Sequence, residues 1–333
     1  MDSKRILITG SSGLLGTAVL PALLATGWPL RLLLRNTTPS ALALLPPRVA
    51  ESANVEIIEG DITDIASLQA AAKDCTHIVH MAGLVLFSSK DKNKLLKVNQ
   101  EGTANLVNVA LGLPSFQHFI HISSISAIAT AEAEKRTGVH LQQFSGWYGY
   151  TKKLAEMEVH RGGAEGLPFS ILRPSVVLGV QASARSSAGI IKMAIGRIAL
   201  RPPGFLHWVD ARDVATAIAN LINTESKGQT YLLDSKPATW SEFYTKLRGA
   251  MGIGGFIYSI PIGLVSIGAY LAPLLSIFFP FPVPNRKQLM ALLQTKQYSE
   301  KDDAPLPNAQ VLSELDSTIA ELTDQLRKNP FNK

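Results

Sequence analysis

The chain has 333 residues, 46% of them hydrophobic, which suits one large globular α/β domain or a core with a smaller lobe and excludes a disordered chain. The net charge of +6 is not gathered into basic runs, which argues against a nucleic-acid surface. A single cysteine, Cys75, excludes an intrachain disulfide, and the first apolar run is too short for a signal peptide, so we expect a cytoplasmic protein that is membrane-associated at most.

The first half of the chain alternates short apolar strands with helices. Strands are predicted at Arg5–Thr9, Leu30–Arg35, Val55–Glu59, His77–Met81, His118–Ser123 and Phe169–Arg173. The predicted helices are Leu14–Ala25, Ile65–Ala72, Leu95–Leu111 and Tyr148–Arg161. Strands that are apolar on both faces and separated by helices predict a Rossmann-type, doubly wound parallel sheet. Its ligand would bind beyond the carboxyl ends of the strands.

The second half has a looser pattern. Further elements are predicted at His207–Val209, Ala211–Asn223, Thr230–Leu233, Ser241–Met251 and, as an amphipathic tail, Ala309–Arg327. We expect residues 1–175 to form the nucleotide-binding core, with 206–233 returning to it. Residues 176–205 and 234–333 would form a smaller, mostly helical substrate lobe.

One segment of the expected lobe, Phe256–Pro284, contains no charged residue. Its centre, Ile262–Phe279, approaches the roughly 20 apolar residues of a membrane span, and Arg286 and Lys287 follow it. Several prolines interrupt the segment, however, and proline breaks a regular helix. We therefore favour lobe helices over the active-site mouth, or contact with a membrane surface, over a true span.

A glycine-rich segment, Thr9–Gly16, follows the first predicted strand directly. Gly10 permits a tight turn, Gly13 lets the backbone approach a pyrophosphate, and Gly16 lets the next helix pack close to the strand. The pyrophosphate would lie on the N–H groups at the helix start. The flanking strand and helix favour a dinucleotide site over a simple connecting turn. The expected contacts are Gly10, Ser12, Gly13, Leu14, Leu15 and Gly16.

The end of the second predicted strand bears on the choice of cofactor. In NAD-binding proteins an acidic residue there holds the ribose 2′-hydroxyl. Here the strand ends Leu34-Arg35-Asn36, without a carboxylate. The planar cation of Arg35 suits the 2′-phosphate of NADP(H), which we therefore expect in preference to NAD(H). The alternative is a solvated arginine at a strand end.

Tyr148 and Lys152 lie four residues apart, which places them on one face of a helix. A nearby ammonium favours the phenolate, so we expect Lys152 to lower the pKa of Tyr148 and make it an acid/base group near neutral pH. Ser124 follows the predicted strand His118–Ser123 at its carboxyl end and could hydrogen-bond the reacting oxygen; the alternative is a turn-capping serine. Tyr150 and Lys153 are an alternative tyrosine–lysine pair on the same helix, but these residues are only three apart.

Taken together, these motifs resemble those of the extended short-chain dehydrogenases/reductases over residues 5–235. In chain order the matching segments are TGxxGxxG at Thr9–Gly16, GD at Gly60-Asp61, HxAG at His80–Gly83, VNxxGT at Val98–Thr103, the serine at Ser124, YxxxK at Tyr148 and Lys152, and RP at Arg173-Pro174.

The resemblance implies hydride transfer between C4 of a nicotinamide and a carbon that bears a hydroxyl or carbonyl. It makes Tyr148 the acid/base and Ser124 the group that orients the oxygen. Lys152 would tune Tyr148 and hold the ribose, and Asn99 would support a water path near Lys152. Further cofactor contacts are implied for Asp61, Ile62, Met81, Ala82, Gly83, Pro174 and Val176.

Two branches of that family compete for the substrate. Arg35, the lack of an Asp-Glu pair after Ser124 and the apolar lobe favour the branch that resembles dihydroflavonol reductases and 3β-hydroxysteroid dehydrogenases, with a sterol-, flavonoid- or lipid-like substrate. An NDP-sugar epimerase/reductase is the alternative, and a non-catalytic NADP-binding sensor or scaffold subunit is a further one. Relatives pair through helices matching Leu95–Leu111 and Tyr148–Arg161, so a homodimer is an option.

A metal site is not expected. His77 and His80 are three apart on one predicted strand, and His118 and His121 are three apart on another. Alternation along a strand sends such neighbours to opposite faces.

Overall fold

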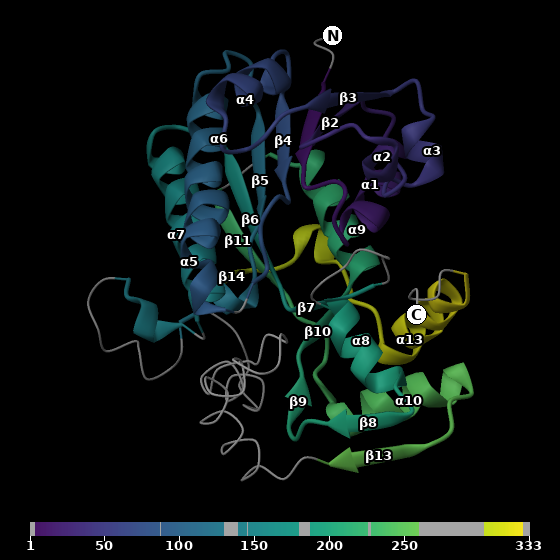
Figure 1. Cartoon of the computed structure of the whole chain (residues 1–333). Helices are drawn as coiled ribbons and strands as arrows, with labels where there is room; N and C mark the ends of the chain where they lie inside the picture. The colour runs from purple at the N-terminus through teal and green to yellow at the C-terminus, as the bar shows by residue number, and fades with distance from the viewer. Residues whose placement is uncertain are drawn as a thin grey trace.

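The computed structural model describes residues 4–86, 88–129, 139–144, 146–179, 187–225, 228–259 and 303–328 (Figure 1). Eight parallel strands form one large sheet in the order β14-β11-β6-β5-β4-β1-β2-β3. The strands are β1 (Ile6–Thr9), β2 (Leu30–Leu34), β3 (Val55–Glu59), β4 (His77–His80), β5 (His118–Ile122), β6 (Phe169–Pro174), β11 (Gln229–Leu233) and β14 (Asp303–Ala304). The strand order reverses between β1 and β4, where ligands bind in doubly wound sheets.

Helices cover both faces of this sheet, which confirms the predicted Rossmann-type α/β fold (Figure 1). On one face lie α4 (Ile65–Ala72), α6 (Gly102–Leu111) and α7 (Trp147–Ala164); on the other lie α1 (Gly16–Leu24) and α9 (Ala211–Ile222). The short helices α2 (Pro39–Leu42), α3 (Pro47–Ala50) and α5 (Lys92–Leu95) join these elements, and a π-helical turn, Leu96–Glu101, leads from α5 into α6.

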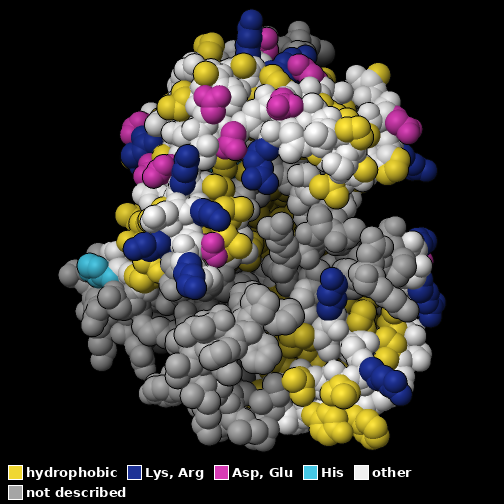
Figure 2. All heavy atoms as spheres, in the orientation of Figure 1, with side chains coloured by type: hydrophobic (Ala, Val, Ile, Leu, Met, Phe, Trp, Pro, Cys, Tyr) yellow, Lys and Arg dark blue, Asp and Glu magenta, His cyan; other side chains and the backbone are white. Residues whose placement is uncertain are grey.

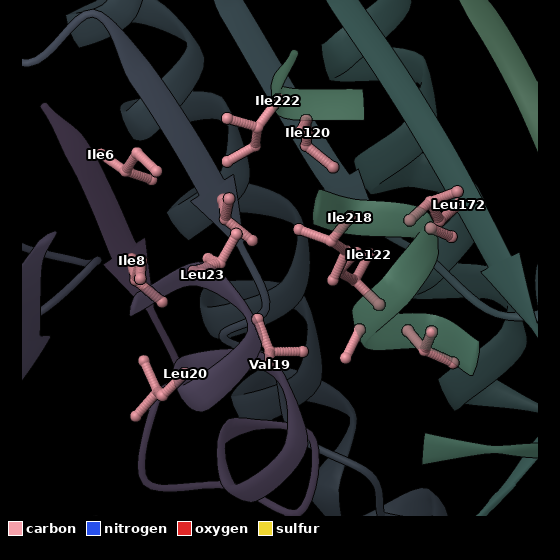
Figure 3. Packing of buried hydrophobic residues seen from close by; sticks show 14 of the residues in the cluster. Ile6, Ile8, Val19, Leu20, Leu23, Ile120, Ile122, Leu172, Ile218 and Ile222 are labelled. Carbon is pink, nitrogen blue, oxygen red and sulfur yellow. The ribbon is translucent and has the colours of Figure 1, made fainter. Parts of the chain in front are cut away.

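Alternation along the strands explains the two faces. Ile6 and Ile8 of β1 point into the cluster under α1 and α9, whereas Leu7 points into the cluster under α4 and α6. Figure 3 shows the first cluster, in which Val19 and Leu23 of α1 pack against the sheet. All four residues of β1 are buried, as expected for a central parallel strand.

A smaller lobe has its own hydrophobic cluster, which includes Trp208, Phe243 and Leu322. Its helices are α8 (Ser187–Ile195), α10 (Trp240–Met251) and α13 (Leu315–Lys328). Three two-stranded sheets accompany them: β7 (Val176–Leu178) with β10 (Trp208–Asp210), β9 (Phe205–Leu206) with β12 (Ala238–Thr239), and β8 (Ile198–Arg201) with β13 (Phe256–Ser259). Of these strands the sequence predicted only β10, as an element at His207–Val209.

The C-terminal part of the chain differs from the prediction in two ways. β14, placed in the lobe from the sequence, pairs with β11 and completes the large sheet. The tail helix begins at Leu315, not at Ala309. Before it, Ser313 donates from its N–H and hydroxyl to the carboxylate of Asp213, at 2.7 and 2.9 Å, and these bonds hold the segment extended against α9.

Of the uncharged segment 256–284, only Phe256–Ser259 lies within the described residues, so its predicted relation to a membrane or to the active-site mouth stays a prediction. Within the part of the chain that the structure describes, no helix is long and apolar enough to cross a bilayer.

Candidate active site

The glycine-rich loop joins β1 to α1 and requires its glycines for steric reasons. Gly10 has a φ of +75°, and a Cβ there would lie 2.5 Å from the backbone nitrogen of Ala82. At Gly16 a Cβ would lie 1.7 Å from the carbonyl oxygen of Ser11. The chain therefore makes a close turn into the N-terminus of α1, the geometry that receives a pyrophosphate. Ser12, Gly13, Leu14 and Leu15 form the rest of this cradle.

Arg35 follows β2 and is exposed at the same edge of the sheet. The segment after it is hydroxyl-rich and folds back on β3, where the hydroxyl of Thr37 donates to Glu59 at 2.9 Å. Glu59 is paired with Leu34 across the two strands. This carboxylate beside the end of β2 comes from another strand, so the sequence around Arg35 gave no sign of it.

The segment after β4 is held against the glycine loop by a buried chain of hydrogen bonds. Thr9 accepts from the N–H of Ala82 at 3.2 Å and contacts His80 Nδ1 at 2.7 Å. His80 Nε2 lies 3.0 Å from Thr103 Oγ1, which donates to the carbonyl of Asn99. Burial lowers the pKa of His80 to about 3, so it is neutral and serves as a fixed structural link.

The other predicted cofactor residues lie along the same edge. Met81, Ala82 and Gly83 follow β4. Asp61 follows β3 and accepts from the N–H and hydroxyl of Thr63, both at 2.8 Å, while Ile62 packs under Gly102. Pro174 ends β6 and Val176 begins β7. The structure thus gathers the predicted contacts at the carboxyl ends of the strands.

Tyr148, in the first turn of α7, lies next to Ser124. Ser124 caps the short helix Ile125–Ala127, accepting from the N–H of Ser126 at 3.1 Å, and its side chain is also hydrogen-bonded to Tyr148. The two readings of this serine, as a cap and as an active-site hydroxyl, are therefore compatible. Gly149 permits the approach, since a Cβ there would lie 2.3 Å from the carbonyl of Ser126.

Lys152 lies one turn further along α7 and is 5% exposed. Its Nζ donates to the carbonyl of Ile122 at 2.6 Å. Burial lowers the pKa of Lys152 to about 8, and Glu156 opposes that shift. A Cβ at Gly83 would lie 3.9 Å from Nζ, so the absence of a side chain there opens the space between the cofactor edge and the amine.

Asn99 occupies the π-helical turn and pins the segment after β4. Its Oδ1 accepts from the N–H of Leu84 at 2.7 Å, and its Nδ2 donates to the carbonyl of Leu84 and to Thr151 Oγ1, each at 3.1 Å. Thr151 Oγ1 in turn donates to the carbonyl of Tyr148 at 3.0 Å. Asn99 thus links the turn that precedes α6 to the backbone that carries Tyr148. A π-bulge is a common feature of functional sites.

The expected lowering of the Tyr148 pKa is wrong for this structure. Burial raises the pKa of Tyr148, and the hydrogen bond from Ser124 opposes the shift only in part. Lys152 is not among the groups that shift this pKa, and its amine donates to the carbonyl of Ile122. Tyr148 is therefore held as a protonated phenol in the protein alone.

Tyr150 and Lys153, the alternative pair on this helix, make structural contacts. Tyr150 packs between Phe144 and Trp147, with ring centroids 5.9 and 5.8 Å away. Lys153 lies 3.5 Å from a carboxylate oxygen of Glu156. The geometry therefore favours Tyr148 with Lys152.

A buried charge network behind the site was not predicted. Arg173 donates to both oxygens of Glu156 at 2.8 and 2.7 Å, and Ser123 donates to the same carboxylate at 2.7 Å. Glu156 is fully buried, and these donors hold its pKa below the usual range despite the cost of burial. The network fixes α7 against β5 and β6, so it positions Lys152.

The histidines of β4 and β5 form pairs that the sequence reasoning overlooked. His77 is paired with His118, and His80 with His121, across the two strands, with ring centroids 6.2 and 5.3 Å apart. Same-strand neighbours do point to opposite faces, but cross-strand partners share one. Burial lowers the pKa of all four, so they are neutral. Among the described residues no cluster suited to a metal ion occurs.

A cavity of about 430 Å³ lies elsewhere, between α1, α9 and α13. Thr17, Arg212 and Glu321 are among its lining residues, and Arg212 is already engaged by Asp210 and Glu321. Because the proposed catalytic side chains do not line it, we do not assign the substrate to this cavity.

Comparison with known proteins agrees with the geometry. The family model described as "NAD dependent epimerase/dehydratase family" matches residues 6–233. Sterol demethylase protein B of Methylococcus capsulatus is 27% identical over 286 residues, covering 84% of each chain. A 3 beta-hydroxysteroid dehydrogenase/Delta 5-->4-isomerase of Mycobacterium tuberculosis is 26% identical over 74% of this chain and 70% of its own length.

Solved structures share the fold. That of gox2253 matches with a TM-score of 0.78 and 23% identity over 99% of this chain and 100% of its own. UDP-glucuronic acid 4-epimerase from Bacillus cereus matches with a TM-score of 0.69 and 17% identity over 97% and 99% of the two chains. At these identities the likeness bears on the fold alone.

Proposed function

Because this chain belongs to the NAD-dependent epimerase/dehydratase family and is an NAD(P)-dependent enzyme of the extended short-chain dehydrogenase/reductase type, we propose that it is an NADP(H)-dependent oxidoreductase acting on a carbonyl or hydroxyl carbon of a hydrophobic substrate. The observation that carries the proposal is the Tyr148–Ser124 hydrogen bond beside the buried amine of Lys152, at the carboxyl ends of the strands. The bound nicotinamide supplies or accepts the hydride.

Each side chain has a distinct role in this reaction. Tyr148, whose pKa is raised, is a proton donor to a substrate oxygen at neutral pH, which suits reduction of a carbonyl. Ser124 hydrogen-bonds the same oxygen and keeps the phenol oriented. Lys152, an ammonium below a pH of about 8, would hold the nicotinamide ribose.

NADP(H) is supported by Arg35, an exposed guanidinium at the end of β2 with hydroxyl-bearing residues after it. A hydrophobic substrate is supported by the apolar character of the lobe and by the similarity to proteins named for sterol and steroid chemistry. The similar UDP-sugar epimerase structures, below 25% identity, carry no argument for a sugar nucleotide.

The catalytic assignment is tested with Tyr148→Phe, using Tyr150→Phe as the matched control. NADPH oxidation is followed over a panel of steroid, aryl and aliphatic ketones and UDP-sugars. Tyr148→Phe should lose at least about 100-fold in turnover while NADPH affinity stays within about twofold, since a positioned acid typically contributes 10²–10⁴-fold. Equal loss in both variants would remove the assignment. Turnover of UDP-sugars alone would favour the epimerase alternative, and NADPH binding without any turnover the sensor alternative.

The cofactor assignment is tested with Arg35→Ala, using Arg48→Ala, an exposed arginine on α3, as the control for lost charge. Loss of a charge-assisted contact worth about 1.5–3 kcal/mol should weaken NADPH about 10- to 100-fold and leave NADH unchanged. Equal affinities of the wild-type protein for the two cofactors would contradict the assignment.

A further inference from the structure

The pair of strands β8 and β13 at the edge of the lobe is apolar on both faces. Ala199 and Ile257 face the hydrophobic cluster of the lobe. Ile198, Leu200, Phe256 and Tyr258 alternate with them and are 66%, 51%, 70% and 53% exposed. A sheet with one buried face normally carries polar residues on the other, so this outer face departs from the usual pattern.

These four side chains form one continuous surface, which we call the β8–β13 face. In the parallel register, Phe256 lies beside Ile198 and Tyr258 beside Leu200. The rings of Phe256 and Tyr258 are 6.1 Å apart. Figure 2 shows hydrophobic side chains gathered at this end of the molecule, with Lys and Arg side chains beside them. An exposed apolar surface of this kind marks a contact with a partner or a membrane.

The two described segments that carry the face contain positive charges only. The described segment from residue 187 to 206 carries Lys192, Arg197 and Arg201 and no carboxylate, and the segment from 249 to 259 carries no charge. Lys192 and Arg197 are exposed, and Arg201 hydrogen-bonds Ser241 and Ser259. The apolar face thus has a cationic rim.

A buried guanidinium adds to this positive potential. Arg248 is 4% exposed and donates to the carbonyls of Ala194, Gly196 and Gly254, at 2.9, 2.6 and 2.6 Å. These bonds join the turn before β8 to the turn before β13, so the same arginine holds the two strands together. Among the described residues its hydrogen-bond partners are neutral carbonyls, and no carboxylate is paired with it.

We infer that the β8–β13 face docks on an anionic lipid bilayer. The apolar side chains would enter the headgroup boundary, where aromatic residues are favoured, and the cationic rim would face anionic headgroups. A second copy of the chain fits less well, because a twofold contact through this face would bring Lys192 and Arg197 of both copies together. In sequence, the uncharged run continues past Ser259 to Pro284 and ends at Arg286 and Lys287, which extends the same chemistry.

The test measures binding, not turnover, so it is independent of the proposed reaction. The full-length protein is floated with vesicles of phosphatidylcholine alone or with about one-third phosphatidylglycerol. Binding to the anionic vesicles should be at least tenfold tighter and should weaken with added salt, since basic residues near the surface are attracted to anionic headgroups and salt screens that attraction. Ile198→Ser/Phe256→Ser should lose about tenfold or more in partitioning, because each removes apolar area from the bilayer.

A matched control is Ile65→Ser/Val311→Ser, which removes two apolar side chains that are 50% and 89% exposed elsewhere. It should bind vesicles as the wild type does. Unchanged NADPH affinity and melting temperature show that both variants are folded. Equal binding of both double variants, or no binding of the wild type to anionic vesicles, overturns the inference. A concentration-dependent dimer in light scattering that Ile198→Ser/Phe256→Ser abolishes would instead assign the face to a second copy.

Discussion

Replacing Lys152 with methionine tests how much the burial of this amine costs in folding free energy. The amine is buried at 5% exposure with one hydrogen bond, to the carbonyl of Ile122. Burial disfavours the charged form, which lowers the pKa of Lys152 from 10.5 to about 8. The unfolded chain therefore binds more protons than the folded one between about pH 8 and 10.5, so this group lets stability rise with pH across that window.

The size of the effect follows from the shift. At about 1.4 kcal/mol per pKa unit, the change from 10.5 to about 8 makes charged Lys152 cost roughly 3 kcal/mol of folding free energy at neutral pH. By pH 10 the same linkage leaves a cost of about 1 kcal/mol. Methionine has no such titration but leaves the Ile122 carbonyl without its donor, which costs about 1–3 kcal/mol at every pH. The change with pH is thus the clean signal.

The assay is urea unfolding of the cofactor-free wild-type, Lys152→Met and Lys153→Met proteins at pH 7 and 10. The stability of Lys152→Met relative to the wild type should fall by about 2 kcal/mol between the two pH values, since other titrations cancel in the difference. Lys153, 23% exposed beside Glu156, should show no comparable fall. A difference that is the same at both pH values would mean that Lys152 titrates normally, and the account of its burial would be wrong.

Three other perturbations test the surroundings of the site. Glu156→Gln removes the carboxylate that accepts two hydrogen bonds from the buried guanidinium of Arg173 and should cost about 3–5 kcal/mol, seen as a lower urea midpoint; no loss would contradict a tight pair. Gly10→Ala should lower both the melting temperature and the affinity for NADPH. Gly27→Ala, with a similar φ of +77° and open space around it, should lower only the melting temperature. Equal effects of the two substitutions on NADPH affinity would argue against a cofactor cradle at Gly10. Burial raises the pKa of Cys75 to about 11, so iodoacetamide at pH 8 should label the native protein roughly 100-fold more slowly than the unfolded one.

The sequence predicted what local pattern controls. Continuous apolar strands and the spacing of Gly10, Gly13 and Gly16 determine the parallel sheet and the turn into α1, and Tyr148 and Lys152 share a helix face because four residues make about one turn. Contacts between segments that lie far apart in the sequence could not be predicted from such local patterns. The direction of the Lys152 amine depends on a carbonyl thirty residues earlier. The pKa of Tyr148 is raised by burial, which depends on segments that pack around the helix and not on the spacing within it.

Partners brought together by the sheet escaped the sequence for the same reason. His80 and His121 are adjacent only because β4 and β5 align in register. The pairing of Glu156 with Arg173 needs α7 to lie across β6. The short lobe strands β9 and β13 are not flanked by the regular strand–helix alternation that marks β1 and β4, so the secondary structure of the lobe was underestimated.

The last strand of the large sheet has a consequence for synthesis on the ribosome. A nascent chain that has emerged as far as Leu233 possesses seven of the eight strands, but β11 still presents an open hydrogen-bonding edge until Asp303 and Ala304 arrive. Over the same interval Arg173 lacks its contact with Asp303, which lies 3.4 Å away in the folded protein. An open edge invites pairing with other chains, so the interval during which the lobe is translated is when this protein is most exposed to misassembly and to chaperone capture.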